Sequence, residues 1–566
     1  MKVGGLIPLV PLALAALASA GCAGTGTSAG FGTGAGGSMG TGTGGVSGFH
    51  CTTAACVPPL SAHLSWAVEI DPSSGQSSAA IRELPVDLYG AGSPLDLMAA
   101  QSTTIGITFN APAGVSVPSA ANVVLTVPAI IPGRPALTFQ APTVLASTST
   151  SSATFAIPSD RLGTTASMAL VPLPSADQVS PPRSFSVVLA DGLSVSLPND
   201  DLVVNGTLLS AIAKAPTSTF VARAFQGGTQ VSSAPPTQAD GTFRLVLPSA
   251  AVTAANPLTI QLTPQTQSDP WFVSNPISFP LSPTTSSYGP VMLPAYSNLN
   301  QFNLAVRSAA DSSANVSGAV VRAQTTVGTS SLGTTQFARS GTTDANGIAS
   351  LSLLPGTATA TLAYAIAVTP PVNSVYASQC VASVEVTSGG STVNSASAPT
   401  LTTVMLAFRP QLTGTVTDSQ GYPLANVSIT ATPGPAASGT CTAAATSPSN
   451  TTTDTNGMFG LPLDPGTYQL DYDPPPGSAA PRFTELGVQV SGSGAAQILH
   501  NLTLPAGGLV KGIAIVPGGS QPLSSATIRI FEPRCTGAGC TTPPWLRGQT
   551  VTDGNGQFQI VVPLPQ

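Results

Sequence analysis

Glycine and proline interrupt this chain about once every five residues, with 57 glycines and 54 prolines among 566 positions. Both residues disfavour helix interiors, and proline also removes a donor from any strand ladder. Only 7% of the residues are charged, too few for the solvent-facing sides of long amphipathic helices. A hydrophobic content of 42% is too high for a chain kept disordered by charge. The sequence therefore predicts an all-β, turn-rich protein of several domains.

The first 21 residues have the layout of a secretory signal peptide, with Lys2 before an apolar run and small residues after it. The run Ser19-Ala20-Gly21-Cys22 resembles the lipobox of bacterial lipoproteins, a family whose signal is cut before a lipidated cysteine. The resemblance implies lipidation of Cys22, and Ala23 after it implies sorting to the outer membrane. The alternative is an ordinary signal peptide with a cysteine near its end.

Residues 23–48 are mostly glycine, serine, threonine and alanine. This composition predicts a random-coil tether with a root-mean-square reach of ~25–30 Å. The tether spells G-x-S-x-G at 26–30 and again at 36–40. Neither copy has the strand before it and the helix after it that a nucleophile elbow requires, so we expect a spacer rather than a catalytic site.

Six cysteines follow Cys22, and an even number in an exported chain predicts disulfides. They are Cys51, Cys56, Cys380, Cys441, Cys535 and Cys540. The first two and the last two lie close together along the chain, so we expect two local disulfides. The middle two pair with each other or stay free. A zinc site is the competing hypothesis because His50 and His63 flank the first pair, but zinc fingers cluster their ligands more tightly.

The chain also repeats itself at intervals of about 100 residues, the usual size of a β-sandwich domain. From Gly414, strands with alternating apolar residues are separated by turns at 418–421, 454–457 and 465–466. The same order returns from Gly512, and fainter copies come earlier. We expect a signal peptide over 1–21, a lipidated cysteine and tether over 22–48, an N-terminal extension with strands over 49–95, and five repeats over 96–200, 201–297, 298–409, 410–508 and 509–566.

The best-defined repeat also resembles a known family. The run G-x-V-x-D-x-x-G-x-P-L from Gly414, with D-x-N-G-x-F from Asp454 and P-G-T-Y from Pro465, resembles the carboxypeptidase regulatory-like domain. The resemblance implies an Ig-like, transthyretin-like (prealbumin-like) β-sandwich with an accessory, noncatalytic role. It covers 410–508 most clearly and extends in part to 509–566 and 298–409.

The fifth repeat ends early. It stops at Gln566, soon after the strand that carries Phe558 and Ile560, whereas repeat four continues through Pro465-Gly466 into further strands. We therefore expect an incomplete sandwich with an unpaired strand edge, which frays, accepts a strand from a partner, or reflects a truncated gene product.

Few residues offer catalytic or metal chemistry. The three histidines, His50, His63 and His500, have no nucleophile suggested by pattern. The carboxylate pairs Asp200-Asp201 and Asp471/Asp473 are expected to be solvated turn residues rather than glycosidase acids. The Asp-x-Asn-Gly turns at Asp344, Asp454 and Asp553 contain half of a calcium loop but lack its later ligands. We expect no cofactor, no metal and no enzymatic activity.

Aromatic residues leave a binding role open. Trp66 alternates with Leu64 and Val68 and is expected in a core. Trp271 and Trp545 stand in proline-flanked stretches, where they recognise a ligand or cover a sandwich end. A net charge of −6 excludes a nucleic-acid partner. The sequence predicts a noncatalytic spacer or adhesion lipoprotein with an envelope partner; the alternative is a carbohydrate- or peptide-binding surface protein.

Overall fold

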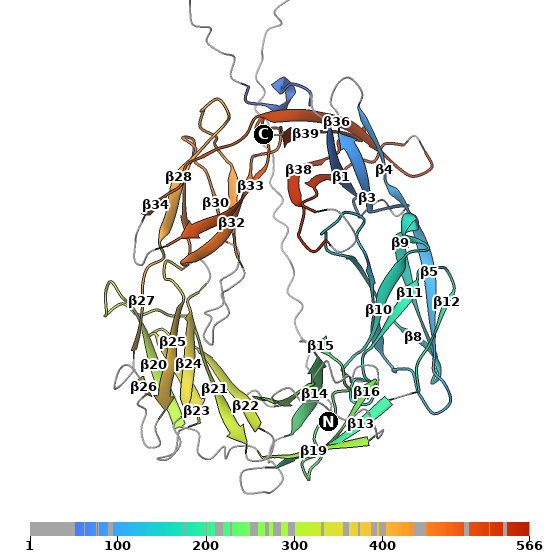
Figure 1. The fold of residues 1–566 in the computed structure, drawn as a ribbon, viewed down its shortest axis with the longest axis vertical. Coiled ribbons are helices and arrows are strands. Elements are labelled where there is room, and N and C mark those ends of the chain that lie inside the picture. Colours follow the sequence, from blue (N-terminus) through green and yellow to red (C-terminus); the bar gives the residue numbers. More distant parts are fainter. Residues whose placement is uncertain are drawn as a thin grey trace, which may run out of the picture. The chain divides into compact units, whose positions relative to one another are not determined.

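The computed structural model is all-β, as the glycine- and proline-rich sequence predicts (Figure 1). Strands make up 60% of the described residues, which otherwise contain only two short 3-10 helices, η1 (Ala54–Cys56) and η2 (Ser159–Arg161). The structure describes residues 51–564 except 61–62, 75, 77, 89–93, 175, 200, 210–218, 227–228, 249–257, 266–270, 275–284, 293–299, 330–332, 355–361, 372–373, 387–392, 396–402, 435–448, 492–496, 520 and 536–539. Cys22 and the tether lie outside the described residues.

The first sandwich spans residues 100–196. One sheet has the order β12-β5-β9-β8, formed by Leu193–Ser196, Ala100–Asn110, Thr150–Pro158 and Val144–Ser147, and the short β2 (Ala79–Ala80) pairs with β5. The other has the order β11-β10-β6-β7, formed by Arg183–Val188, Thr165–Pro172, Ala121–Val127 and Leu137–Pro142. Alternate residues of both sheets bury one core, as period-2 patterning requires.

The described residues between 201 and 406 form three sheets, whereas two separate sandwiches would have four. Two small sheets have the orders β16-β13-β19 (Thr242–Pro248, Asp201–Leu209, Thr285–Met292) and β23-β20-β27 (Ile348–Leu353, Asn300–Ser308, Thr403–Leu406). The third is a nine-stranded sheet of order β15-β14-β17-β18-β22-β21-β24-β25-β26. Its strands are Thr229–Gln230, Phe220–Gln226, Thr259–Pro264, Trp271–Ser274, Gly333–Thr342, Val320–Thr329, Ala363–Thr369, Gln379–Val386 and Val393–Ser395. Repeats two and three are thus joined through the β18–β22 pairing and share one buried cluster.

Residues 411–503 form a sandwich that serves as a template for the others. One sheet has the order β31-β28-β34, formed by Met458–Pro462, Gln411–Thr417 and Gln497–Leu499, with β35 (Leu502–Thr503) also on β28. The other has the order β30-β29-β32-β33, formed by Ser449–Thr452, Ser428–Pro433, Gly466–Asp473 and Phe483–Val490. The central strand β28 pairs antiparallel with β31 and parallel with the late strands β34 and β35.

The last sandwich is built from both ends of the described chain (Figure 1). The C-terminal strands are β36 (Gly507–Ile515), β37 (Thr527–Glu532), β38 (Trp545–Val551) and β39 (Gln557–Pro563). The N-terminal strands are β1 (Leu64–Asp71), β3 (Arg82–Leu88) and β4 (Leu95–Met98). They combine into sheets of order β3-β1-β37-β38 and β39-β36-β4, over one core. We call this domain the shared sandwich.

Comparison with the template shows what the N-terminal strands replace. β1 and β3 extend β37 as β32 and β33 extend β29, and β4 runs parallel to β36 as β34 runs parallel to β28. Glycines mark the equivalence, because a Cβ on Gly414 would collide with the backbone oxygen of His500, and one on Gly512 with that of Leu95. The residues before repeat one therefore supply the strands that the fifth repeat lacks.

This arrangement corrects two expectations from the sequence. Residues 49–95, expected to form an N-terminal extension with strands, do contain strands, but β1 and β3 belong to a sheet of residues 507–563 and β2 to the first sandwich. The fifth repeat is not an open half-sandwich either, because β1 and β4 cover the edges of β37 and β36. The apolar residues of β36–β39 required a partner, and the chain's own N-terminal strands provide it.

Candidate functional site

The outer face of the shared sandwich is covered by a loop of the first sandwich. Along β1, Val68 and Ile70 point into the core, so Ala67 and Glu69 lie on the opposite face. Ala67 packs with Ile131, which lies between β6 and β7, and with Phe531 of β37. Three parts of the chain therefore meet on this face, which is the candidate site.

Two buried glutamates lie side by side at this junction. Glu69 of β1 and Glu83 of β3 are paired in register, and both side chains are fully buried. Glu69 accepts hydrogen bonds from Arg134 and, at 2.5 Å, from Arg529 of β37. Because an unpaired buried charge is strongly unfavourable, these two arginines are what permits Glu69 to be buried in its charged form.

Glu83 is neutralised by the first sandwich. Its Oε2 accepts hydrogen bonds from the Arg161 guanidinium at 2.7 Å and from the backbone N–H of Ile130 at 2.8 Å. Arg161 is itself 2% exposed and also donates to the carbonyl of Pro128 at 3.3 Å. The two glutamates thus fix β1 and β3 against both neighbouring parts of the chain.

Arg529 connects the N-terminal and C-terminal strands. It donates to Glu69 and, at 3.1 Å, to Asp71. Burial disfavours its charge, but the hydrogen bonds and negative charges of the two carboxylates outweigh burial and raise the pKa of Arg529. The guanidinium is therefore a permanent cation at the seam between β1 and β37.

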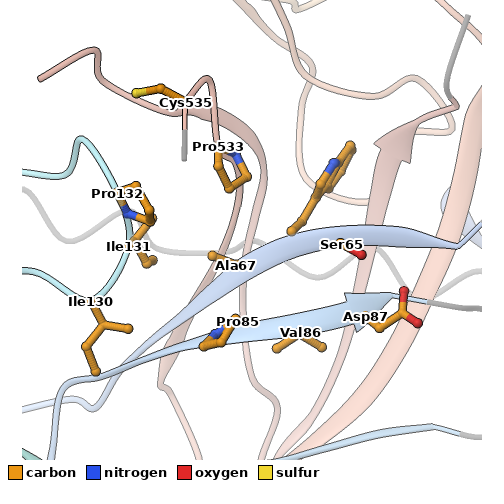
Figure 2. A pocket seen from close by; sticks show the side chains of 11 residues that line it. Ser65, Ala67, Pro85, Val86, Asp87, Ile130, Ile131, Pro132, Pro533 and Cys535 are labelled. Carbon is orange, nitrogen blue, oxygen red and sulfur yellow. The ribbon is translucent and has the colours of Figure 1, made fainter. Parts of the chain in front are cut away.

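A cavity of about 440 Å³ opens beside this cluster (Figure 2). Figure 2 shows Ile131 and Pro132 on one side of it, Pro533 across from them, and Pro85 and Val86 on β3 beneath. The remaining lining residues are Ser65, Trp66, Ala67, Asp87, Ile130 and Cys535. The volume lies in the ordinary range for small-molecule or peptide side-chain sites.

The lining of the cavity is mainly apolar. Ser65 contributes a hydroxyl and Asp87 a carboxylate, and Asp87 lies 3.2 Å from the Nδ1 of His63. This combination suits an apolar group, such as a peptide side chain, better than a sugar, which needs many hydrogen-bond partners.

The three tryptophans differ in setting. Trp66 is half-buried and packs against the core of the shared sandwich, so it is less enclosed than the sequence predicts. Trp545 is half-buried between the guanidinium groups of Arg534 and Arg547, 4.9 and 4.3 Å from its ring centre. These contacts favour a ring that covers the sandwich. Trp271 begins β18, where its backbone pairs with Ala338.

The local disulfides form as the spacing predicts. Cys51 is bonded to Cys56, with Cα atoms 5.7 Å apart, and Cys535 to Cys540, with Cα atoms 5.9 Å apart. Cys380 is also disulfide-bonded, and Cys441 lies outside the described residues. The first pair therefore does not form the zinc site that was the competing hypothesis.

The other candidate residues take structural roles. His63 and His500 contact Asp87 and Glu485, while His50 and Asp200 lie outside the described residues. Both carboxylate oxygens of Asp201 accept from the same terminal nitrogen of Arg183, at 2.8 and 2.9 Å. Asp471 accepts from Thr484 at 2.6 Å, and Asp473 from Arg482 at 3.0 Å.

In each Asp-x-Asn-Gly turn, the aspartate carboxylate accepts hydrogen bonds from the backbone of the same turn. In Asp344, Asp454 and Asp553, Oδ1 accepts backbone N–H groups two and four residues later, at 2.8–2.9 Å. The glycines of these turns have φ of 69–72°, the left-handed conformation that glycine adopts most easily. Throughout the described ranges, no group of three or more His, Cys, Asp or Glu could hold a metal ion.

Sequence reasoning missed the buried glutamates. Glu69 and Glu83 stand inside apolar strand runs, W-A-V-E-I and R-E-L-P-V, of a chain with only 7% charged residues. A charge at such a position signals a buried ion pair, but nothing in the sequence identifies its partners. Arg134, Arg161 and Arg529 come from three distant segments, so only the fold brings them together.

Comparisons with known proteins identify one segment. Residues 411–503 match the carboxypeptidase regulatory-like domain, in agreement with the resemblance found in the sequence. No curated protein sequence matches the chain. Among the part of the chain that is described, no helix is long and apolar enough to cross a membrane.

Solved structures give only weak matches. They include the Bacillus anthracis TIE protein (11% identity, TM-score 0.17, 71% of this chain and 74% of that one). The pilus adhesin SpaC of Lactobacillus rhamnosus GG matches with 12% identity and TM-score 0.19, over 89% and 57% of the two chains. A streptococcal ancillary pilin matches with 9% identity and TM-score 0.17, over 54% and 100%. TM-scores this low do not establish a shared arrangement, so the matches carry no functional argument.

Proposed function

We propose that this chain is a noncatalytic structural protein of the bacterial envelope, anchored by a lipid on Cys22 and used for spacing or adhesion. The signal peptide, the lipobox-like run before Cys22 and the composition of residues 23–48 support export and anchoring. The expected site is the outer membrane or cell surface, with a glycan or an envelope protein as partner.

One observation supports the structural role: the charged side chains that were candidates for catalysis or metal binding form hydrogen bonds and ion pairs within the fold. The turn aspartates bind their own backbone, and the buried glutamates pair with arginines. Arginine–aspartate pairs also join successive sandwiches, Arg183 with Asp201 and, at 3.0 Å, Arg409 with Asp464. Such pairs stabilise the contacts between domains, which supports a role as a spacer.

The anchor is tested by metabolic labelling with an alkynyl fatty acid in a bacterial host. We expect the full-length chain to take up label and to fractionate with the outer membrane. Cys22→Ser should take up none and should appear in the soluble fraction or remain uncleaved in the inner membrane. Absence of label on the unmodified chain would overturn the lipoprotein proposal. Protease shaving of intact cells then tests surface display.

The cavity beside Ala67 supports the second candidate, a peptide-binding surface protein. Its apolar, proline-lined walls suit one apolar peptide side chain, and Asp87 at the edge suits a neighbouring basic group. Ile130 lines the cavity and is 43% exposed, so a larger side chain at this position can fill the cavity without disturbing a buried core. Ile130→Trp should abolish binding of any peptide selected from a displayed library while leaving the melting temperature unchanged. Binding that survives this substitution would place the peptide site elsewhere.

A further inference from the structure

We propose that β36–β39 form an acceptor site for strands, that β1, β3 and β4 are the donor that fits it, and that the donor can come from a second copy of this chain. Such exchange would link copies head to tail. The inference depends on the shared sandwich and not on the lipid anchor or on the adhesion role.

The backbone of the acceptor requires strands on two edges. β1 pairs antiparallel with β37 from Ala67↔Phe531 to Asp71↔Thr527, and β4 pairs parallel with β36 from Leu95↔Gly512 to Met98↔Ile515. Without the donor, these edges of β37 and β36 would present unpaired N–H and C=O groups, which makes them templates for strand addition.

The apolar surfaces of donor and acceptor are also complementary. The donor contributes Val68, Ile70, Leu88 and Leu97, and the acceptor contributes Val510, Ile528, Ile530, Phe558 and Ile560, all at most 4% exposed. In the whole chain, these residues of the two halves form a single buried cluster. An acceptor without its donor would expose an apolar face, which strongly favours the capture of matching strands.

Charge fixes the register of the pairing. Arg529 of the acceptor donates to Glu69 and Asp71, which lie two positions apart on one face of β1. A shift of one residue would turn both carboxylates toward the core. The acceptor therefore selects this segment rather than any apolar strand.

The connectivity makes exchange possible for this sandwich in particular. In the template, β32–β34 follow β28–β31 directly along the chain. In the shared sandwich, residues 99–506 separate donor from acceptor, and the contacts are the same whichever copy supplies the donor. The acceptor can pair with the donor strands of its own chain or with those of another chain, and their effective concentrations decide between the two. Crowding of copies on a surface would raise the concentration of donors from other chains and so favour exchange.

Two full-length variants with complementary defects test the proposal. Val68→Asp with Ile70→Asp disables the donor, and Ile528→Asp with Ile530→Asp disables the acceptor. Each variant keeps one intact half, so strand exchange predicts that the mixture forms a 1:1 complex of doubled mass, measured by light scattering after size exclusion. Each variant alone is the control and should remain monomeric. A mixture that shows only monomers would overturn the proposal.

Crosslinking provides a second measurement that needs no disrupted core. Asp71 and Thr527 face each other in the β1–β37 register, so Asp71→Cys with Thr527→Cys places a disulfide across the seam. After partial unfolding and return to native conditions at increasing protein concentration, exchange predicts a ladder of covalent multimers on non-reducing gels. Only internally bonded monomers at every concentration would show that the donor closes on its own chain alone.

Discussion

At the scale of single residues, Glu69 is the side chain on which the stability of the shared sandwich most depends. It is fully buried between Arg134 and Arg529, so removal of its charge leaves Arg134 without its carboxylate partner and Arg529 with Asp71 alone. We expect Glu69→Gln to destabilise the shared sandwich by about 3–5 kcal/mol, the usual effect of breaking a buried ion pair. Urea denaturation followed by tryptophan fluorescence measures this, because Trp66 and Trp545 both lie in that domain.

Asp87→Asn is the matched control in the same domain. It removes the surface pair with His63, in which the Asp87 and His63 side chains are 60% and 64% exposed, and should cost only about 0–1 kcal/mol. Equal shifts for the two variants would mean that Glu69 is not buried as an ion pair in solution.

Asp344 makes a pH-dependent contribution to the stability of the folded protein. Backbone hydrogen bonds, first that from Ile348, lower the pKa of Asp344 below its usual value of 3.8. Its contribution is therefore fully present above about pH 3.8 and is lost as the pH falls through the lowered pKa. Asp344→Asn keeps an acceptor oxygen without the charge, so the stability difference between the two proteins should shrink below pH 3.8. Denaturation midpoints that run parallel at all pH values would contradict this.

At the scale of elements, one threonine organises each recurring turn. Thr343, Thr453 and Thr552 are buried directly before the turn aspartate. In Thr552, Oγ1 donates to the carbonyl of Leu523 at 2.5 Å and accepts the N–H of Ala526 at 2.9 Å. The other two threonines make the same pair of bonds. The repeat is therefore T-D-x-N-G rather than D-x-N-G.

We expect Thr552→Val to destabilise the shared sandwich by about 1–3 kcal/mol, because it leaves a buried donor and a buried acceptor unsatisfied. Thr552→Ser keeps the hydroxyl and is the control, with a smaller loss. Thermal melting of the two variants separates the hydroxyl from the methyl group. A serine variant as unstable as the valine variant would assign the effect to packing.

The sequence could predict these elements but not all of their partners. Alternation and turn residues identify the strands of 414–472 and 512–562, and the run around Trp66 as a strand. Alternation shows which face of β1 is buried, but not that β1 pairs with β37, which lies more than 450 positions later in the chain. The sequence shows that repeat five lacks strands. It also shows strands in residues 49–95 that belong to none of the predicted repeats, and these are the strands that complete repeat five.

At the scale of the whole molecule, the shared sandwich makes the N-terminal and C-terminal parts of the chain depend on one another. The segment that carries the first disulfide takes part as well: the N–H of Ala54 donates to the carbonyl of Gly477 at 2.8 Å, that of Leu60 to Leu509 at 3.1 Å, and that of Leu509 to Pro58 at 2.9 Å. The start of the described chain thus contacts both of the last two sandwiches. Damage to the first strands should therefore appear as loss of order in the last repeat.

A single cut in the chain tests this dependence. Pro198 and Asn199 are exposed between the first and second sandwiches, so a protease site inserted there can be cleaved in the folded protein. After cleavage, the fragment ending at 198 contains β1–β4 and the other contains β36–β39. We expect the two fragments to co-elute as one particle, because the shared sandwich still holds them together through its backbone pairs, its core and Arg529.

The same cleaved chain carrying Val68→Asp and Ile70→Asp is the control and should separate into two fragments, since the remaining link between the first two sandwiches includes the Arg183–Asp201 pair but no shared core. If the cleaved chain without these substitutions also separates, the N-terminal strands do not complete the last repeat in solution. If the control stays intact, other contacts between the fragments, such as the Arg183–Asp201 pair and the hydrogen bonds of Ala54 and Leu60 with the last two sandwiches, are strong enough to join them.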